Sequence, residues 1–444
     1  MNCANHYYHS ADGQKMGAEP VWFNLTLDGR NAVSIFVQLE CGANIAGKMA
    51  LMQFDTGDAS FPGHELGMAR SNHPGIGWFR YLSTQPGSAH TRFTLVPPPG
   101  FSGSIRVGIR TWWENDRVVL KSFMALPDSD PQALCASYLP LRNTERYRVR
   151  TWSSLTEFLC ADEIGNGMHT IAMDDLLLDF YLLARPDSPL LCFLHGNAPR
   201  PDSHMMPILS GWAVTRGVPA SVLMFSDPAL LLDRKLQLAW HAGTRSVSTQ
   251  YAYQLILEKI KAELVPSRLV FWGGSGGGFA SLYLSAVFPG STAFVWNPQT
   301  SILRYEEEAV AQFGKTCFGC RHLEDLPAVL DGRVVSDVAS AFLHADNTVI
   351  YLQNANDWHA KAHLLPFLSK LNAALPAPAY SGWITERLYL HLSDFSDGHS
   401  PPSKHVIARL LHALAETDAR ELDIQCLIED ASRLDDAEAA VNHS

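Results

Sequence analysis

The chain has 444 residues, more than one ordinary hydrophobic core holds, so two domains are expected. Hydrophobic residues make up 47% and charged residues 18%, a globular composition that excludes a largely disordered chain. The formal charge is -11 and no basic block stands out, which argues against nucleic acid as a partner.

The N-terminus and the cysteines bear on the compartment. The first ten residues lack the basic start and apolar run of a signal peptide, and no stretch approaches the ~18 consecutive apolar residues of a membrane helix. The cysteines are scattered, and Cys192 lies inside an apolar run, as expected for reduced thiols in a cytoplasmic protein. Cys317 and Cys320 have a metal-like spacing, but no second pair of ligands accompanies them, so we predict a loop with two free thiols and no metal.

Residues 19–125 are rich in short runs that suit β-strands. Turn residues separate these runs, and no helical period lies between them, which predicts an antiparallel β-sandwich over residues 1–145. The runs are Val21–Leu27, Ala32–Leu39, Met49–Phe54, Gly77–Leu82, Phe93–Val96, Ile105–Trp113 and Val118–Phe123. Trp78, Trp112 and Trp113 are candidates for stacking on a sugar, although core packing is the simpler role for them.

From about residue 150 strand-like runs alternate with longer helical stretches. Alternation of this kind predicts a mostly parallel sheet with helices on both faces, here over residues 150–415. The expected strands are Leu190–Leu194, Ala220–Phe225, Leu269–Trp272, Thr292–Trp296, Thr348–Gln353 and Arg387–Leu392. The expected helices are Thr249–Glu263, Phe279–Phe288, His359–Leu375 (with a break or kink at Pro366) and Pro402–Ala415. Residues 416–444 are acidic and predict a C-terminal helix or tail.

The strongest motif is the glycine-rich turn Gly273-Gly274-Ser275-Gly276-Gly277. A strand precedes it and an apolar helix follows, which is the context in which a nucleophilic serine sits on a strained strand-to-helix turn. No Lys-Ser or Lys-Thr follows the glycines, so a phosphate-binding loop is excluded. We predict Ser275 as a nucleophile, with the backbone amide of Gly276 as a donor to an oxyanion.

A second oxyanion donor is expected from the loop after an upstream strand. The strand Leu190–Leu194 ends in His195-Gly196-Asn197, and the His-Gly pair after an apolar run is typical of that loop. We assign the second backbone amide to Asn197. The alternative is that His195 only caps the strand.

The acid and the base are expected to follow the serine in the order carboxylate, then histidine. Asp357 comes just after the strand that ends at Gln353, and it could fix the tautomer of a histidine. His399 lies in the loop before the last helix and is the best general base. Asp394 and Asp397 compete for the role of the acid.

Other histidines are weaker candidates. His391 lies within a strand and His405 within the last helix. His359 and His363 are four residues apart on a helix, which suits a metal, but the glutamate of a zinc protease is missing between them. A metal-dependent hydrolase built on this pair remains an alternative.

Three further residues are candidates for substrate binding. Asn297 and Gln299 follow the strand after the nucleophile helix, at the sheet edge where ligands bind in open α/β sheets, and they could hydrogen-bond a hydroxylated substrate. Trp240 precedes the nucleophile and could supply an aromatic wall, although a core role is equally compatible with its surroundings.

Together these motifs resemble the α/β-hydrolase superfamily, with the resemblance covering residues 180–415. Asn297-Pro298-Gln299-Thr300, Asp357-Trp358-His359 and Asp397-Gly398-His399 are also similar to bacterial capsular-polysaccharide biosynthesis proteins and accessory-secretion glycan O-acetyltransferases. The resemblance implies Ser275, Asp357 and His399 as nucleophile, acid and base. It also implies a β-rich domain ahead of the hydrolase core.

The expected reaction is acyl transfer or ester hydrolysis through an acyl-Ser275 intermediate, without a cofactor. The resemblance indicates an acylated carbohydrate, so a glycan or small-molecule ester is the expected partner. The alternative from another class is a non-catalytic glycan-binding or assembly component, because fold alone does not establish activity. A peptidase is a third possibility, but no residue pattern indicates peptide recognition.

Overall fold

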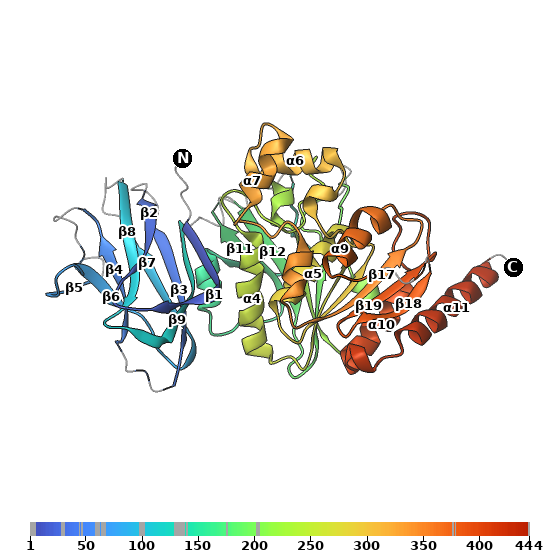
Figure 1. Ribbon diagram of the computed structural model, residues 1–444, viewed down its shortest axis with the longest axis horizontal. Coiled ribbons are helices and arrows are strands. Elements are labelled where there is room, and N and C mark those ends of the chain that lie inside the picture. Colours follow the sequence, from blue (N-terminus) through green and yellow to red (C-terminus); the bar gives the residue numbers. More distant parts are fainter. Residues whose placement is uncertain are drawn as a thin grey trace. The chain divides into compact units, whose positions relative to one another are not determined.

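The computed structural model describes residues 6–442 except 28–31, 44, 46–47, 58–62, 64–67, 97–102, 128–137, 139–140, 175, 201–204, 375–376 and 378. The chain forms two compact units. In Figure 1 the colours follow the sequence from blue at the N-terminus to red at the C-terminus. The first comprises residues 1–134, 152–162 and 171–175, and the second comprises residues 135–151, 163–170 and 176–444. Among the described helices, none is both long and apolar enough to cross a membrane.

The first unit contains two antiparallel sheets. One has the strand order β1-β9-β3-β7 and the other β2-β8-β4-β6-β5. A shared apolar core includes Ile35 and Val37 of one sheet and Met52 and Val107 of the other, so these faces pack as a sandwich. The strands are β1 (His6–Met16), β2 (Val21–Leu27), β3 (Val33–Cys41), β4 (Ala50–Asp55), β5 (Ala69–Arg70), β6 (Trp78–Tyr81), β7 (Gly87–Leu95), β8 (Gly103–Thr111) and β9 (Asn115–Pro127). A short helix, α2 (Leu155–Leu159), belongs to the same unit.

A ten-stranded sheet has the order β10-β11-β12-β14-β13-β15-β16-β17-β19-β18. Its strands are β10 (Val149–Trp152), β11 (Gly167–Met173), β12 (Leu176–Leu183), β13 (Leu190–Leu194), β14 (Ser221–Phe225), β15 (Leu269–Gly274), β16 (Thr292–Trp296), β17 (Thr348–Asn354), β18 (Tyr380–Thr385) and β19 (Leu388–Ser393). Neighbouring strands from β14 to β19 in this order pair in parallel. At the two ends of this parallel part, β12 pairs antiparallel with β14 and β18 pairs antiparallel with β19. Two pairs of strands are exchanged relative to the chain order, β13 with β14 and β18 with β19, and the first exchange is that of the α/β-hydrolase fold.

Helices cover both faces of this sheet (Figure 1). Successive residues of a strand point to opposite faces, and both sets are buried here. Leu191 and Phe193 of β13 share a core with the C-terminal helices, whereas α5 contacts β13, β15 and β16 and packs on α4. The longer helices are α4 (Thr249–Leu264), α5 (Ser275–Val287), α6 (Glu307–Phe318), α10 (Lys404–Glu416) and α11 (Ile424–Asn442), and the shorter ones are α3 (Trp212–Thr215), α7 (Leu326–Leu330), α8 (Val338–Leu343) and α9 (Leu365–Lys370).

Both Cys317 and Cys320 are free thiols, as predicted, but Cys317 lies in the last turn of α6 and only Cys320 lies in the loop that follows. Cys317 is buried and Cys320 is partly exposed. Cys192 is a buried free thiol in β13. Burial raises the pKa of the Cys192 thiol well above its ordinary value, so it behaves as a small apolar side chain.

A buried ion pair anchors the segment that precedes β10. Arg142 Nε donates to Asp179 Oδ2 at 2.7 Å and Arg142 Nη2 donates to Asp179 Oδ1 at 2.8 Å. Nη2 also donates to Thr170 Oγ1 at 2.7 Å. The two charged side chains are only 6% and 2% exposed.

Replacing Arg142 by methionine should lower the free energy of unfolding by about 3–5 kcal/mol, because the Asp179 carboxylate stays buried without its partner. Urea unfolding measures the change. Lys370→Met is the control, since Lys370 and Asp337 are 40% and 28% exposed, and loss of such a pair costs at most about 1 kcal/mol. Equal losses in the two variants would contradict the prediction.

Candidate active site

Ser275 lies where β15 ends and α5 begins. Its φ is +55°, in the left-handed region that a residue with a Cβ atom rarely adopts. Strain of this kind persists only where the surrounding structure enforces it, and it is concentrated at functional sites. The side chain is partly buried, on the sharp strand-to-helix turn expected of a nucleophile.

Close packing explains the glycines around this serine. A Cβ atom on Gly277 would lie 2.1 Å from the carbonyl oxygen of Leu194, and one on Gly274 would lie 2.0 Å from Trp296 Nε1. Neither position can hold a side chain without displacing its neighbour. The glycines therefore allow the ends of β13 and β16 to approach the nucleophile turn from two sides.

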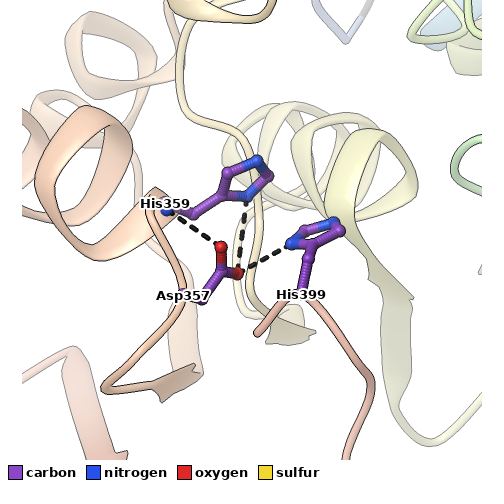
Figure 2. Close-up of side chains that lie close together, drawn as sticks. All are labelled: Asp357, His359 and His399. Atoms are coloured by element: carbon purple, nitrogen blue, oxygen red, sulfur yellow. Dashed lines mark hydrogen bonds and ion pairs between the residues drawn. The ribbon is translucent and has the colours of Figure 1, made fainter. Parts of the chain in front are cut away.

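Asp357 and His399 meet beyond the ends of two parallel strands. Asp357 follows β17 and His399 follows β19, and Asp357 Oδ2 accepts a 2.7 Å hydrogen bond from His399 Nδ1 (Figure 2). Asp357 Oδ1 accepts from the backbone N–H of His359 at 3.0 Å. The carboxylate is buried, whereas the His399 side chain is 34% exposed.

The environment keeps Asp357 ionised. Burial by itself raises the pKa of this carboxyl, but the hydrogen bonds from His399 and the His359 backbone outweigh burial, so the pKa lies below its ordinary value. An ionised Asp357 holds Nδ1 of His399 protonated and leaves Nε2 free to accept a proton. The pair is therefore arranged as an oriented general base.

The rival residues Asp394, His391 and His405 have other hydrogen-bond partners. The carboxylate of Asp394 accepts from Asn356 Nδ2 at 2.7 Å. His391 bonds to Ser381 and Ser393, and His405 pairs with Asp435 on α11.

Asn297 connects the ends of β16 and β17 with the His399 loop. Its Oδ1 accepts from the backbone N–H of Asn354 at 2.7 Å, and its Nδ2 donates to the carbonyl of Ser400 at 2.9 Å. Asn354 Nδ2 donates in turn to the carbonyl of Gly398 at 2.6 Å. The side chain of Asn297 is buried, so the contacts present here position the base rather than face a substrate. Asn354 was not singled out from the sequence, although a polar residue at the end of a buried strand is a usable signal.

Gln299 contacts the nucleophile directly. Its backbone N–H donates to the carbonyl of Ser275, and its Nε2 donates to Ser275 Oγ, both at 3.1 Å. Gln299 Oε1 accepts from Trp240 Nε1. Gln299 and Trp240 are both fully buried, so a stacking wall for a substrate is not what Trp240 forms in this structure.

Ser275 and His399 do not share a hydrogen bond in the described part of the chain, where Ser275 Oγ is bonded to Gln299. Catalytic hydrogen bonds are often long without substrate and tighten only in the complex, so we expect a bond between Ser275 and His399 to form when substrate binds.

The loop after β13 runs beside the nucleophile turn. A Cβ atom on Gly196 would lie 3.4 Å from Ser275 Cβ and 3.5 Å from the amide nitrogen of Gly276. The next residue, Asn197, is exposed. His195 is buried, and its Nε2 accepts from the backbone N–H of Asp227 at 3.0 Å, which fixes the loop. The assignment of Gly276 and Asn197 as the two oxyanion donors stays a prediction.

His359 and His363 form a buried pair behind His399. The His359 ring lies 4.1 Å from the His399 ring and 4.7 Å from the His363 ring, measured between centroids. His359 Nδ1 donates to the carbonyl of Asn297 at 2.9 Å, and His363 Nδ1 accepts from the backbone N–H of Thr300 at 3.2 Å. The Nε2 atoms of both rings are buried without a hydrogen-bond partner.

Among the described residues, Asp357, His359 and His399 form the group that could hold a metal ion. One ligand atom from each lies within 4.8 Å of the others. Ligands of a tetrahedral zinc ion are about 3.4 Å apart, so small side-chain shifts would be needed. A metal there would also compete with the hydrogen bond between Asp357 and His399.

The buried histidine pair should make the fold sensitive to acid. Burial, and then the charge of His399, lowers the pKa of His359 to about 4, and burial with the charge of His359 lowers that of His363 to about 3. Between about pH 6.5 and pH 4 the unfolded chain therefore binds more protons than the fold. The free energy of unfolding should fall with decreasing pH, by up to about 1.4 kcal/mol per pH unit for each histidine.

Urea unfolding across this pH range measures the slope. His363→Gln should reduce the number of protons taken up on unfolding by up to one, and so lower the slope. A wild-type slope in His363→Gln would contradict the assignment.

No family model and no curated protein matches the sequence. Three solved structures illustrate the resemblance in fold. The Glycosylation Associate Protein (Gap123) complex from Streptococcus agalactiae is 11% identical, with 95% of this chain and 75% of that chain covered and a TM-score of 0.41. The capsule O-acetyltransferase of Neisseria meningitidis serogroup A is 13% identical, with 58% of this chain and 97% of that chain covered and a TM-score of 0.42. Pyrococcus horikoshii acylaminoacyl peptidase is 12% identical, with 68% of this chain and 46% of that chain covered and a TM-score of 0.42. At these values the activities of those proteins are not evidence for the activity of this chain.

Proposed function

We propose that this protein catalyses serine-dependent acyl transfer through an acyl-Ser275 intermediate. The observation that supports the proposal most directly is the 2.7 Å hydrogen bond between His399 and the buried, ionised Asp357. This pair follows β17 and β19, and the strained Ser275 follows β15 of the same parallel sheet. Carboxyl ends of parallel strands meet at one edge, which is where α/β sheets bind ligands.

In the first half-reaction, His399 Nε2 accepts the proton of Ser275 as Oγ attacks the carbonyl carbon of an ester or thioester. The carbonyl electron pair moves onto oxygen, where the amides of Gly276 and Asn197 stabilise the charge. Collapse of this intermediate expels the leaving group, which takes the proton from His399. Asp357 stabilises the imidazolium while it exists. In the second half-reaction an acceptor hydroxyl repeats these steps and releases Ser275.

The proposed substrate is an acylated carbohydrate. This part rests on the resemblance of the Asn297–Thr300, Asp357–His359 and Asp397–His399 motifs to glycan O-acetyltransferases, as the sequence indicates. The acceptor is water in an esterase and a sugar hydroxyl in a transferase. The same three side chains serve both reactions, because the distinction depends on how the pocket excludes water.

The test is to trap the intermediate. The protein is mixed with p-nitrophenyl acetate, quenched in acid and digested, and we expect the peptide with Ser275 to gain the mass of one acetyl group. Repeating the reaction with sugars distinguishes transfer from hydrolysis, because acetylated sugar accumulates only in the first case. EDTA should leave the rate unchanged, whereas a loss that zinc restores would favour a metal site at His359. A folded protein that is never acetylated would instead favour a non-catalytic glycan-binding component.

A further inference from the structure

Three buried or partly buried groups form a line that ends at the nucleophile. Trp240 Nε1 donates to Gln299 Oε1, and Gln299 Nε2 donates to Ser275 Oγ at 3.1 Å. We propose that Gln299 is a catalytic residue that stabilises negative charge on Ser275 Oγ, and that Trp240 is a positioning residue that fixes the orientation of its amide. The inference rests on the proposed function and adds two residues to its mechanism.

The orientation of the Gln299 amide follows from the chemistry of its partner. A glutamine amide has an acceptor end and a donor end, and reversal exchanges them. The indole N–H of Trp240 can only donate, so it selects the orientation in which Oε1 faces the indole. Nε2 must then face Ser275. Without the indole N–H, the amide could reverse and present its oxygen to the serine oxygen.

Trp240 is held in place by an unusual backbone. Trp240 and His241 both have a φ of +54°, a conformation that costs about 1–3 kcal/mol at each residue. The backbone N–H of His241 donates to Asp227 Oδ2 at 2.7 Å, and His241 Nε2 donates to the carbonyl of His195 at 3.0 Å. These bonds hold the turn against its strain and aim the indole at Gln299.

Aromatic neighbours fix the indole further. Its ring packs edge-on against Phe313 at 5.1 Å and Tyr305 at 5.8 Å between centroids. The Trp240 side chain is completely buried, so water does not compete for the indole N–H. The amide donor is therefore already in place before reaction, which is the condition under which a hydrogen bond stabilises a transition state most.

The bond from Gln299 strengthens when charge develops. A neutral hydroxyl oxygen accepts a hydrogen bond of ordinary strength, whereas an oxygen with negative charge accepts one about twice as strong. Ser275 Oγ gains charge when its proton moves to His399, and again when the acyl group leaves it. Gln299 should therefore accelerate both half-reactions without contributing to substrate binding.

Gln299→Met removes the donor and keeps the approximate shape of the side chain. We expect kcat for p-nitrophenyl acetate to fall about 10²-fold, with KM within twofold of wild type. A role in substrate binding, as predicted from the sequence, would instead raise KM with little change in kcat. Gln254→Met is the matched control, because Gln254 is also buried and bonded, to Tyr283 Oη, but belongs to α4 and does not contact Ser275.

Trp240→Phe keeps the ring and removes the N–H. We expect kcat to fall about tenfold, with the double variant Trp240→Phe/Gln299→Met no slower than Gln299→Met, because both changes act through one amide. Thermal unfolding checks that the variants are folded. If Gln299→Met retains the wild-type kcat while Ser275→Ala is inactive, the inference is overturned and the proposed function stands. Fully multiplicative losses in the double variant would overturn the role of Trp240.

Discussion

Ser275→Ala should lower the rate of ester hydrolysis by about 10⁴-fold or more. Without the hydroxyl no acyl-enzyme forms, and only the oxyanion donors and the bound substrate remain to assist attack by water. The fold should survive, because the substitution removes one oxygen atom and one hydrogen bond, that to Gln299. Steady-state hydrolysis of p-nitrophenyl acetate measures the loss, and urea unfolding checks the fold.

Ser400→Ala is the control for this experiment. Ser400 follows His399 in the same exposed loop, and the bond from Asn297 reaches its backbone carbonyl rather than its hydroxyl. Its activity should stay within twofold of wild type. A Ser275→Ala variant that keeps most of its activity would exclude Ser275 as the nucleophile.

The second large effect is expected at the acid–base pair. His399→Ala removes the proton acceptor, and Asp357→Asn replaces a carboxylate that holds Nδ1 protonated with an amide that can stabilise the wrong tautomer. Each should lower kcat by about 10⁴-fold. The two losses should not multiply in the double variant, because both residues act through one imidazole.

Two comparisons sharpen this prediction. Added imidazole should partly restore His399→Ala, because the side chain is 34% exposed and its removal leaves a space open to solvent. Asp394→Asn should have little effect, since the Asp394 carboxylate bonds to Asn356 and not to His399. If Asp394→Asn were as damaging as Asp357→Asn, the assignment of the acid would be wrong.

Much of the central sheet was predictable because its strands are continuous apolar runs. Leu190–Leu194 and Thr292–Trp296 have the predicted bounds, and α4 differs by one residue at its C-terminal end. The prediction of a mostly parallel sheet with helices on both faces, preceded by antiparallel strands, is confirmed. The strands β10, β11, β12 and β18 were not predicted. Two of these strands pair antiparallel, β12 with β14 and β18 with β19, so the alternation of strand and helix does not predict these two.

The helical stretch predicted from His359 to Leu375 is shorter and less regular. Residues Ala360–Leu364 form a π-helical turn and α9 covers Leu365–Lys370. Pro366 lies in the first turn of α9, directly after the π-helical turn, so the helix is irregular next to the residue that cannot donate a backbone hydrogen bond. The helices α6 to α8 were not predicted, although the run of glutamates at the start of α6 is a usable signal for a helix N-terminus.

The candidate site also contains residues whose role the sequence predicted and residues whose role it did not. Ser275, Asp357 and His399 each follow a strand of the parallel sheet, so strand-like runs in the sequence were enough to single them out. Gln299 and Trp240 were singled out, but for binding a substrate. Their contact depends on the left-handed backbone at Trp240, which no pattern of residue types predicts for a non-glycine position.

The central claim is that Ser275 is a nucleophile activated by His399. Labelling of the folded protein with a fluorophosphonate probe, followed by mapping of the modified peptide, tests it most directly. We expect one labelled residue, Ser275, with labelling abolished in Ser275→Ala, strongly slowed in His399→Ala and unchanged in Ser400→Ala. Labelling at a different residue, or no labelling of a folded wild-type protein, would contradict the claim.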